Sequence, residues 1–102
     1  MSGEFEKKVL QIVKKIKKGK LSTYQLVAQA VGHPLAWRAV GNALNKNPHA
    51  PTIPCHRVIK SNGEIGGYAQ GSHQKKKILR QEGIPCQKNR VLNFRKYLVK
   101  LK

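Results

Sequence analysis

Apolar residues at the start of the chain recur at the spacing of an α-helix. One face of the segment carries Phe5, Val9, Ile12, Val13 and Ile16, and lysines occupy the opposite face. A stripe of this width is typical of an amphipathic helix that packs on a core. The pattern therefore predicts a helix over residues 5–16, which ends at Gly19.

Two further helices are predicted after this one. Ser22 offers an N-cap and Gln25 follows three positions later, so a capping box opens a helix over residues 22–30. Pro34 can occupy the first turn of a third helix, which extends to about residue 44. Two short helices joined by a glycine-containing turn indicate a helix-turn-helix.

The pattern changes in the second half of the chain. The prolines between residues 47 and 54 force an extended segment, and residues 57–60 are predicted to form a strand. Asn62-Gly63 is typical of a tight hairpin turn. A glycine-rich loop follows, and Ser72 caps a helix that ends at Glu82-Gly83.

The C-terminal residues 85–102 combine lysine and arginine with apolar side chains at helical spacing. We expect a basic C-terminal extension that forms a short helix on the domain. Because 102 residues accommodate one small domain, residues 1–102 are predicted to be a single unit. The expected fold class is mainly α with a short β-hairpin, similar to a winged helix-turn-helix.

The charge of the chain is strongly positive: 21 Lys and Arg stand against 4 acidic residues, giving a net charge of +17. Such a field favours a polyanionic partner, although a generic lysine-rich surface and an anionic membrane surface are alternatives. No apolar stretch is long enough to span a membrane. Two cysteines and no signal peptide favour a reducing, cytoplasmic compartment.

The segment around Cys55 carries the chemistry. A cysteine is nucleophilic as its thiolate, and here His56 and Arg57 follow it directly. One alternative is a buried structural cysteine beside an incidental histidine. Another is a zinc site, for which the available side chains are Cys55, Cys86, His49 and His73. Their spacing matches no pattern of paired ligands, so we expect no metal and no cofactor. Cys86 is expected to be a structural or free thiol.

Several motifs in the chain resemble one family. The run Pro-Cys-His-Arg-Val-Ile at 54–59, with Asn47-Pro48 eight residues before the cysteine, resembles the active-site signature of the O6-alkylguanine-DNA alkyltransferases. These are the methylated-DNA–protein-cysteine methyltransferases. Residues 21–28 resemble the family's Ser-Tyr-Gln-x-Leu-Ala helix, and 38–43 resemble its Arg-Ala-Val-Gly recognition helix. The resemblance covers residues 4–84.

The resemblance implies that the protein takes part in DNA repair. Members flip O6-alkylguanine out of duplex DNA and transfer the alkyl group irreversibly to their own cysteine, so each molecule acts once. The implied partner is double-stranded DNA, bound in the minor groove with little sequence specificity by a monomer, in the cytoplasm or on a prokaryotic nucleoid. The part resembled is the family's C-terminal DNA-binding and active-site domain, and the N-terminal domain of most members is expected to be absent.

The resemblance also assigns roles to residues of the reaction centre. Cys55 is implied as the alkyl acceptor, His56 as its base through a water, and Glu82 as the group that orients the imidazole. Asn47 is implied to brace the active-site turn. Tyr24 is implied to contact phosphate and to protonate the guanine leaving group.

A second set of residues is implied in DNA and base recognition. Arg38 would replace the flipped nucleotide in the base stack, from a helix whose Ala39 and Gly41 also face the groove. The substrate pocket would be formed by Tyr68, Val58, Ala69, Gln70 and Trp37. Ala69-Gln70 departs from the family's usual Ser-Gly and places a longer side chain at the pocket rim.

Two other functions remain open at this stage. Alkyltransferase-like proteins are similarly short and bind alkylated guanine without repairing it, but they carry tryptophan or alanine at the cysteine position. A damage sensor that retains Cys55 is therefore the main alternative. A plain winged-helix DNA-binding regulator is the other, and it would not need the Asn, Cys, His and Glu side chains together.

Overall fold

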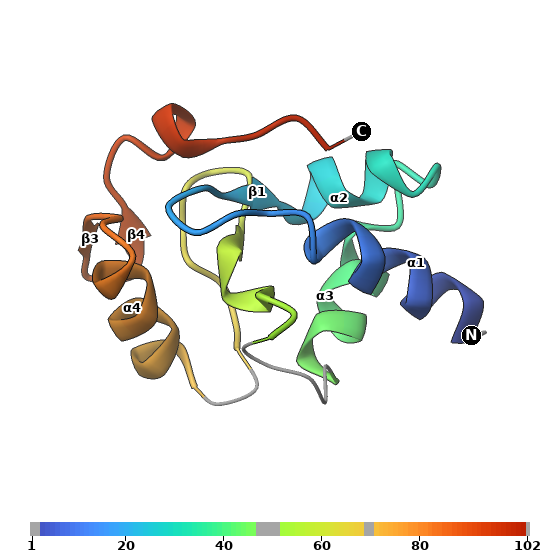
Figure 1. Cartoon of the computed structure of the whole chain (residues 1–102), viewed down its shortest axis with the longest axis horizontal. Helices are drawn as coiled ribbons and strands as arrows, with labels where there is room; N and C mark the ends of the chain where they lie inside the picture. Colours follow the sequence, from blue (N-terminus) through green and yellow to red (C-terminus); the bar gives the residue numbers. More distant parts are fainter. Residues whose placement is uncertain (1–2, 47–51, 69–70, 102) are drawn as a thin grey trace.

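The computed structural model describes residues 3–46, 52–68 and 71–101. Helices α1 (Gly3–Val13), α2 (Tyr24–Ala30) and α3 (Trp37–Asn45) pack against one another on one side of the molecule (Figure 1). Helix α4 (Ser72–Gln81) lies on the other side, and the strands Ser22–Thr23 and Val58–Ile59 lie between them. The expected class, mainly helical with small strands, is confirmed. No helix among the described residues is long and apolar enough to cross a membrane.

The apolar face of α1 is buried as its periodicity predicts. Phe5, Val9 and Val13 enter a core shared with α2 and α3, whose other buried side chains include Val27, Val40 and Leu44. The helix ends at Val13 rather than at residue 16, although Ile16 is still buried. Gly19 has a φ of +84°, so the chain turns there in a backbone conformation that favours glycine.

The predicted starts of the later helices are wrong by one to three residues. Helix α2 begins at Tyr24, because the Thr23 hydroxyl accepts the Leu26 N–H at 3.1 Å, and Ser22 lies in a strand instead. Helix α3 begins at Trp37 and not at Pro34, since a turn closed by Ala36 N–H and the His33 carbonyl precedes it. In α4 the N-cap is Gly71, and Ser72 is already helical.

The described residues form two small two-stranded sheets. Strand β1 (Ser22–Thr23) pairs in parallel with β2 (Val58–Ile59), which follows a 3₁₀ turn over Cys55–Arg57. The turn expected at Asn62-Gly63 is present, since the Gly63 N–H donates to the Lys60 carbonyl at 3.0 Å and the Lys60 N–H donates to the Glu64 carbonyl at 2.8 Å. The strand before it, β2, nevertheless pairs with β1 and not with the chain after the turn. The antiparallel hairpin is formed further on by β3 (Cys86–Gln87) and β4 (Arg90–Val91).

The C-terminal segment is not the helix that its apolar spacing suggested. It contains the β3–β4 hairpin and a 3₁₀ turn at Phe94–Tyr97, and then runs back across the molecule to α2 (Figure 1). Lys88 and Asn93 have positive φ angles, which interrupt any helix. The backbone bonds to Leu21 and Gly63 instead. The apolar side chains join a second core cluster formed by Leu21, Ile59, Ile65, Leu79, Ile84, Cys86, Val91 and Phe94.

Candidate functional site

Cys55 and His56 share one tight turn of the backbone. They form the 3₁₀ turn that leads into β2, and the Cys55 N–H donates to the Ile53 carbonyl at 2.8 Å. Cys55 is a free thiol with 4% of its surface exposed, and His56 is 1% exposed. The turn therefore holds a thiol and an imidazole side by side in the chain, both shielded from bulk water.

Glu82 anchors this turn from the end of α4. Its carboxylate accepts His56 Nε2 at 3.0 Å, and it accepts Arg57 twice, from Nε at 2.9 Å and from an Nη at 2.7 Å. Burial raises the pKa of the Glu82 carboxyl, but the hydrogen bonds from Arg57 and His56 outweigh burial and hold the pKa below its usual value. Glu82 is therefore ionised at neutral pH.

The contact with Glu82 determines the protonation of the His56 ring. Because an ionised carboxylate only accepts hydrogen bonds, Nε2 carries the proton and Nδ1 presents a lone pair. Burial lowers the pKa of His56, against an opposing effect of Glu82, so the ring is neutral at pH 7. Nδ1 is buried and has no hydrogen-bond partner among the described residues. Nδ1 is therefore a base whose lone pair accepts no hydrogen bond from the described residues.

Lys75 lies beneath the same region, completely buried. Its Nζ donates to the Val58 carbonyl at 2.7 Å, to the Gly67 carbonyl at 3.1 Å and to the Tyr24 hydroxyl at 3.4 Å. Burial lowers the pKa of Lys75 to about 7, with a smaller opposing effect from Cys55. Lys75 thus joins three chain segments that surround the cysteine, and it titrates near neutral pH.

Tyr24 and Tyr68 keep their protons at neutral pH. Burial, and secondarily the charge of Cys55, raises the pKa of Tyr24 to about 12 and also raises that of Tyr68. Tyr68 meets the His56 ring edge-on, with ring centroids 6.4 Å apart, and its hydroxyl is buried with no partner among the described residues. Both hydroxyls can therefore act as donors near Cys55.

A pocket of about 410 Å³ opens between α2, α3 and the loop after β2. Its lining includes Tyr24, Gly41 and Asn62. Trp37 and Arg38 also line it, and the Arg38 guanidinium carbon lies 4.9 Å from the centre of the Trp37 ring. Trp37 is 39% exposed.

The structure brings together most, but not all, of the residues singled out from the sequence. His56 and Glu82 are hydrogen-bonded, and Cys55 precedes His56 in the same turn. Tyr24, Trp37, Arg38 and Gly41 line the pocket. Ala39 does not line the pocket and instead packs on the main core. Val58 is buried in β2, and its carbonyl already accepts Lys75. Asn47, Ala69 and Gln70 lie outside the described residues.

Two members of the site had no role assigned to them from the sequence. Arg57 was noted only as a neighbouring charge, yet it holds Glu82 and also donates to the Ile16 carbonyl at 2.7 Å. Lys75 lies four residues before the buried Leu79, on the apolar face of α4. A lysine at a core-facing helical position was the available signal. No cluster of three His, Cys, Asp or Glu side chains able to hold a metal occurs among residues 3–46, 52–68 and 71–101.

Comparison with known proteins places this geometry in a family. Residues 4–84 match the family model described as the DNA-binding domain of 6-O-methylguanine DNA methyltransferase. A methylated-DNA–protein-cysteine methyltransferase of Methanosarcina acetivorans is 48% identical over 80 residues, which are 78% of this chain and 51% of that protein. The Cricetulus griseus protein of the same name is 47% identical over 83 residues, 79% of this chain and 40% of its own length. The chain thus spans about half the length of these relatives or less.

Two solved structures are similar to this chain over most of its length. The S. pombe protein Atl1, in complex with damaged DNA containing O6-carboxymethylguanine, is 35% identical and superposes with a TM-score of 0.87 over 98% of both chains. Mycobacterium tuberculosis OGT, in complex with DNA, is 36% identical with a TM-score of 0.78 over 81% of this chain and 51% of its own.

The position of the family match corrects one expectation. The resemblance was expected to be to a C-terminal domain. The matched residues 4–84 instead lie in the N-terminal part of this chain. The match covers well over half of the chain and includes Cys55, His56 and Glu82. The chain therefore belongs to the family of the 6-O-methylguanine DNA methyltransferase DNA-binding domain.

Proposed function

We propose that this protein repairs O6-alkylguanine in DNA by transferring the alkyl group to Cys55 in a single turnover. The observation that carries the proposal is the hydrogen-bonded arrangement at the cysteine. A neutral His56 is fixed by Glu82 through Nε2 and presents the lone pair of Nδ1, one residue from a buried free thiol. Nucleophile, base and orienting carboxylate are the parts that nucleophilic catalysis requires.

The transfer proceeds in one displacement. His56 Nδ1 takes the thiol proton of Cys55 through a water, and Glu82 stabilises the imidazolium that results. The thiolate sulfur then attacks the alkyl carbon attached to O6. A sulfur–carbon bond forms, the carbon–oxygen bond breaks, and its electron pair remains on the guanine, which takes up a proton. No oxidant, reductant or cofactor enters this balance, and the thioether is the end product.

Tyr24 is suited to supply the proton that guanine takes up. Its raised pKa of about 12 keeps the hydroxyl protonated, and it lines the pocket beside α3. Lys75 fixes the position of this hydroxyl and of the Gly67 carbonyl. Because Lys75 titrates near pH 7, it can return a proton to Tyr24 after the transfer.

Access to the base in a duplex requires the nucleotide to leave the stack, at a cost of a few kcal/mol. Arg38 stands at the exposed start of α3, where it can fill the gap left in the stack from the minor groove. The net charge of +17 provides attraction to any duplex sequence. A monomer bound in this way needs no sequence-specific contacts, which suits a repair protein.

The second candidate is recognition of alkylated guanine without transfer. The end-to-end similarity to S. pombe Atl1, over 98% of both chains, favours this function, because the match to OGT covers only about half of the OGT chain. The two candidates share the pocket and Arg38. They differ in whether Cys55 reacts.

Transfer of a labelled methyl group from duplex DNA to protein distinguishes the two candidates. The wild type, Cys55→Ser and Cys86→Ser are each mixed in excess with methylated duplex. We expect the wild type and Cys86→Ser to become labelled, whereas Cys55→Ser binds the duplex and stays unlabelled. Cys86 is the matched control because it is also a buried free cysteine. Binding of methylated duplex by the wild type without any labelling would contradict repair and support the sensor.

A further inference from the structure

The C-terminal segment adds positive charge next to the pocket. Arg90 lies in β4 and donates an Nη hydrogen bond to the Asn62 carbonyl at 2.7 Å. Arg95 lies over the Phe94 ring, with its guanidinium carbon 4.8 Å from the ring centre. Both residues follow residue 84, where the match to the family model ends. The family match therefore does not account for them.

Tight packing fixes this segment on the loop after β2. The Phe94 ring lies so close to Gly63 that a Cβ there would approach the ring to 2.8 Å. The Val91 N–H also donates to the Gly63 carbonyl at 2.9 Å. Gly63 has a φ of +94°, so both its backbone conformation and its surroundings require glycine. Arg90 and Arg95 are thus held in position by the loop and do not belong to a loose tail.

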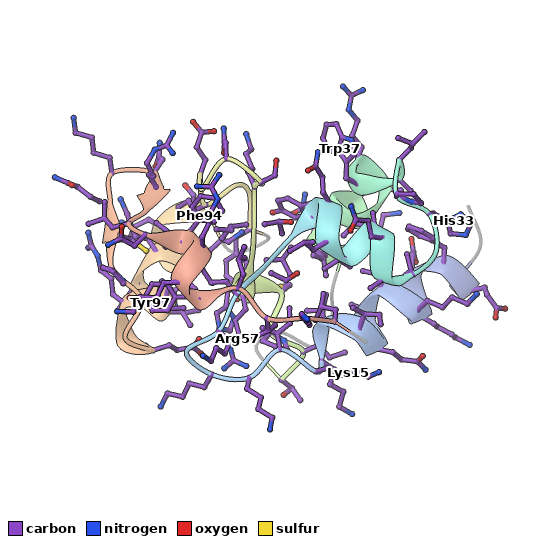
Figure 2. The ribbon with its side chains drawn as sticks, turned by 90° about the horizontal axis from the view of Figure 1, so that it is seen from above. Lys15, His33, Trp37, Arg57, Phe94 and Tyr97 are labelled. Atoms are coloured by element: carbon purple, nitrogen blue, oxygen red, sulfur yellow. The ribbon has the colours of Figure 1, made fainter. Side chains whose placement is uncertain are left out.

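The same loop forms one wall of the pocket. Lys60 and Asn62 line it together with Trp37 and Arg38. The basic cluster, defined here as Lys60, Arg90 and Arg95, therefore continues the pocket rim away from α3. Figure 2 places Trp37 and Phe94 toward one edge of the molecule and Lys15 toward the opposite edge.

The charges in the basic cluster are not cancelled. Glu64 is the acidic side chain near it among the described residues, at 3.6 Å from Lys60 and 3.9 Å from Arg90. Lys60 and Arg90 thus share one carboxylate, and the cluster keeps a net positive charge. The side chains of Lys60 and Arg90 are 55% and 52% exposed, so their remaining N–H groups point to solvent. Exposed guanidinium groups on a fixed support are well suited to bind phosphate oxygens.

We propose that the basic cluster binds the phosphate backbone of duplex DNA beside the flipped nucleotide, as a second contact surface separate from α3. The inference rests on the proposed function, because α3 and the pocket determine where the duplex lies. With the nucleotide at the pocket, the loop after β2 and the 3₁₀ turn at Phe94–Tyr97 would face the adjoining backbone. The cluster then lengthens the stretch of DNA that the protein covers.

The salt dependence of binding measures this contact. Each phosphate contact that is lost lowers the slope of log affinity against log salt concentration by about 0.9. Arg90→Gln/Arg95→Gln should therefore reduce the slope by about 2, while a short duplex that lacks the adjoining backbone should bind the variant and the wild type equally. Arg95→Gln alone should reduce the slope by about 1. This single variant leaves the Arg90–Asn62 hydrogen bond intact, so a change in its slope does not arise from loss of that bond.

The control removes the same charge from the opposite edge. Lys14 and Lys15 are exposed at the end of α1, where they line a separate hollow. Fluorescence anisotropy titrations on long and short duplexes at several salt concentrations compare Lys14→Gln/Lys15→Gln with the arginine variants. Equal changes of slope for both pairs, or an arginine effect that persists on the short duplex, would overturn the inference.

The inference can fail separately from the proposed function. Methyl transfer is measured on the wild type and tests the proposed function, whereas the salt slopes of the arginine variants test the basic cluster. If the wild type transfers methyl but the variant binds long duplex like the wild type, the inference alone is wrong. If no transfer occurs but the slope falls as expected, the basic cluster is supported and the repair function is wrong.

Discussion

Replacement of Glu82 by Gln tests the centre of the site. The side chain keeps its size but loses its charge, and it accepts hydrogen bonds through one oxygen where the carboxylate uses two. Three donated hydrogen bonds, one from His56 and two from Arg57, depend on this carboxylate. The substitution therefore affects both the stability of the fold and the state of the His56 ring.

The expected loss of stability follows from burial. The side chains of His56, Arg57 and Glu82 are 2%, 16% and 10% exposed, so solvent screens their interaction weakly. Removing one partner of a buried ion pair costs about 3–5 kcal/mol. We expect about 3 kcal/mol for Glu82→Gln, because the amide oxygen still accepts one of the bonds.

The pH dependence of stability has a definite sign. The pKa of Glu82 is lower in the folded than in the unfolded state, so the unfolded chain binds more protons in the acid range. The stabilisation is fully present above the unfolded pKa of about 4.5 and is lost as the pH falls through the lower, folded pKa. Glu82→Gln should lack this part of the acid sensitivity.

Urea denaturation and single-turnover methyl transfer measure the two effects. Glu6→Gln is the control, because Glu6 pairs with Lys46 at 3.5 Å on the exposed surface and should cost less than about 1 kcal/mol. The transfer rate of Glu82→Gln should fall about a hundredfold, since the imidazolium loses its counter-charge. A rate within a factor of three or so of the wild type, or a stability loss no larger than that of Glu6→Gln, would refute the reasoning.

Three further substitutions probe the other parts of the site. Between about pH 7 and pH 10 the unfolding free energy should rise, because native Lys75 is neutral there while the unfolded lysine is protonated. Lys75→Met should abolish this rise, and urea titrations at several pH values measure it. Arg38→Ala should slow methyl transfer from duplex DNA far more than reaction with the free O6-methylguanine base, and equal losses would assign Arg38 to the fold. Gly66→Ala should impair transfer more than Gly32→Ala, because both glycines have positive φ but only at Gly66 would a Cβ meet the Tyr24 hydroxyl, at 2.9 Å.

Local sequence patterns predicted which segments are helical more accurately than the residues at which the helices begin and end. The apolar stripe of α1 and the turn at Gly19 follow from spacing and from glycine's conformational freedom. The start of α2 depends on a choice between two adjacent hydroxyl residues, Ser22 and Thr23. Only the pairing of β1 with β2, 36 residues further along, removes Ser22 from the cap. A contact at that distance in sequence leaves no local signal.

In the C-terminal segment, contacts with residues distant in sequence override the local pattern even more strongly. Val91 and Phe94 have helical spacing, yet each is buried against a different neighbour in a hairpin and a 3₁₀ turn. The positive φ angles of Lys88 and Asn93 are imposed by these contacts. For the site, the motif around Cys55 was recognisable in the sequence, whereas the part played by Arg57 depends on Glu82, 25 residues away.

Covalent modification of Cys55 is the most direct test of the account. The wild-type protein is reacted with an excess of duplex DNA containing O6-methylguanine, digested, and analysed by peptide mass spectrometry. The account predicts one added methyl group per chain, located on Cys55, and no further transfer when fresh methylated duplex is supplied. The account would be contradicted if the protein bound the methylated duplex fully while Cys55 stayed unmodified, or if the methyl group were located on Cys86.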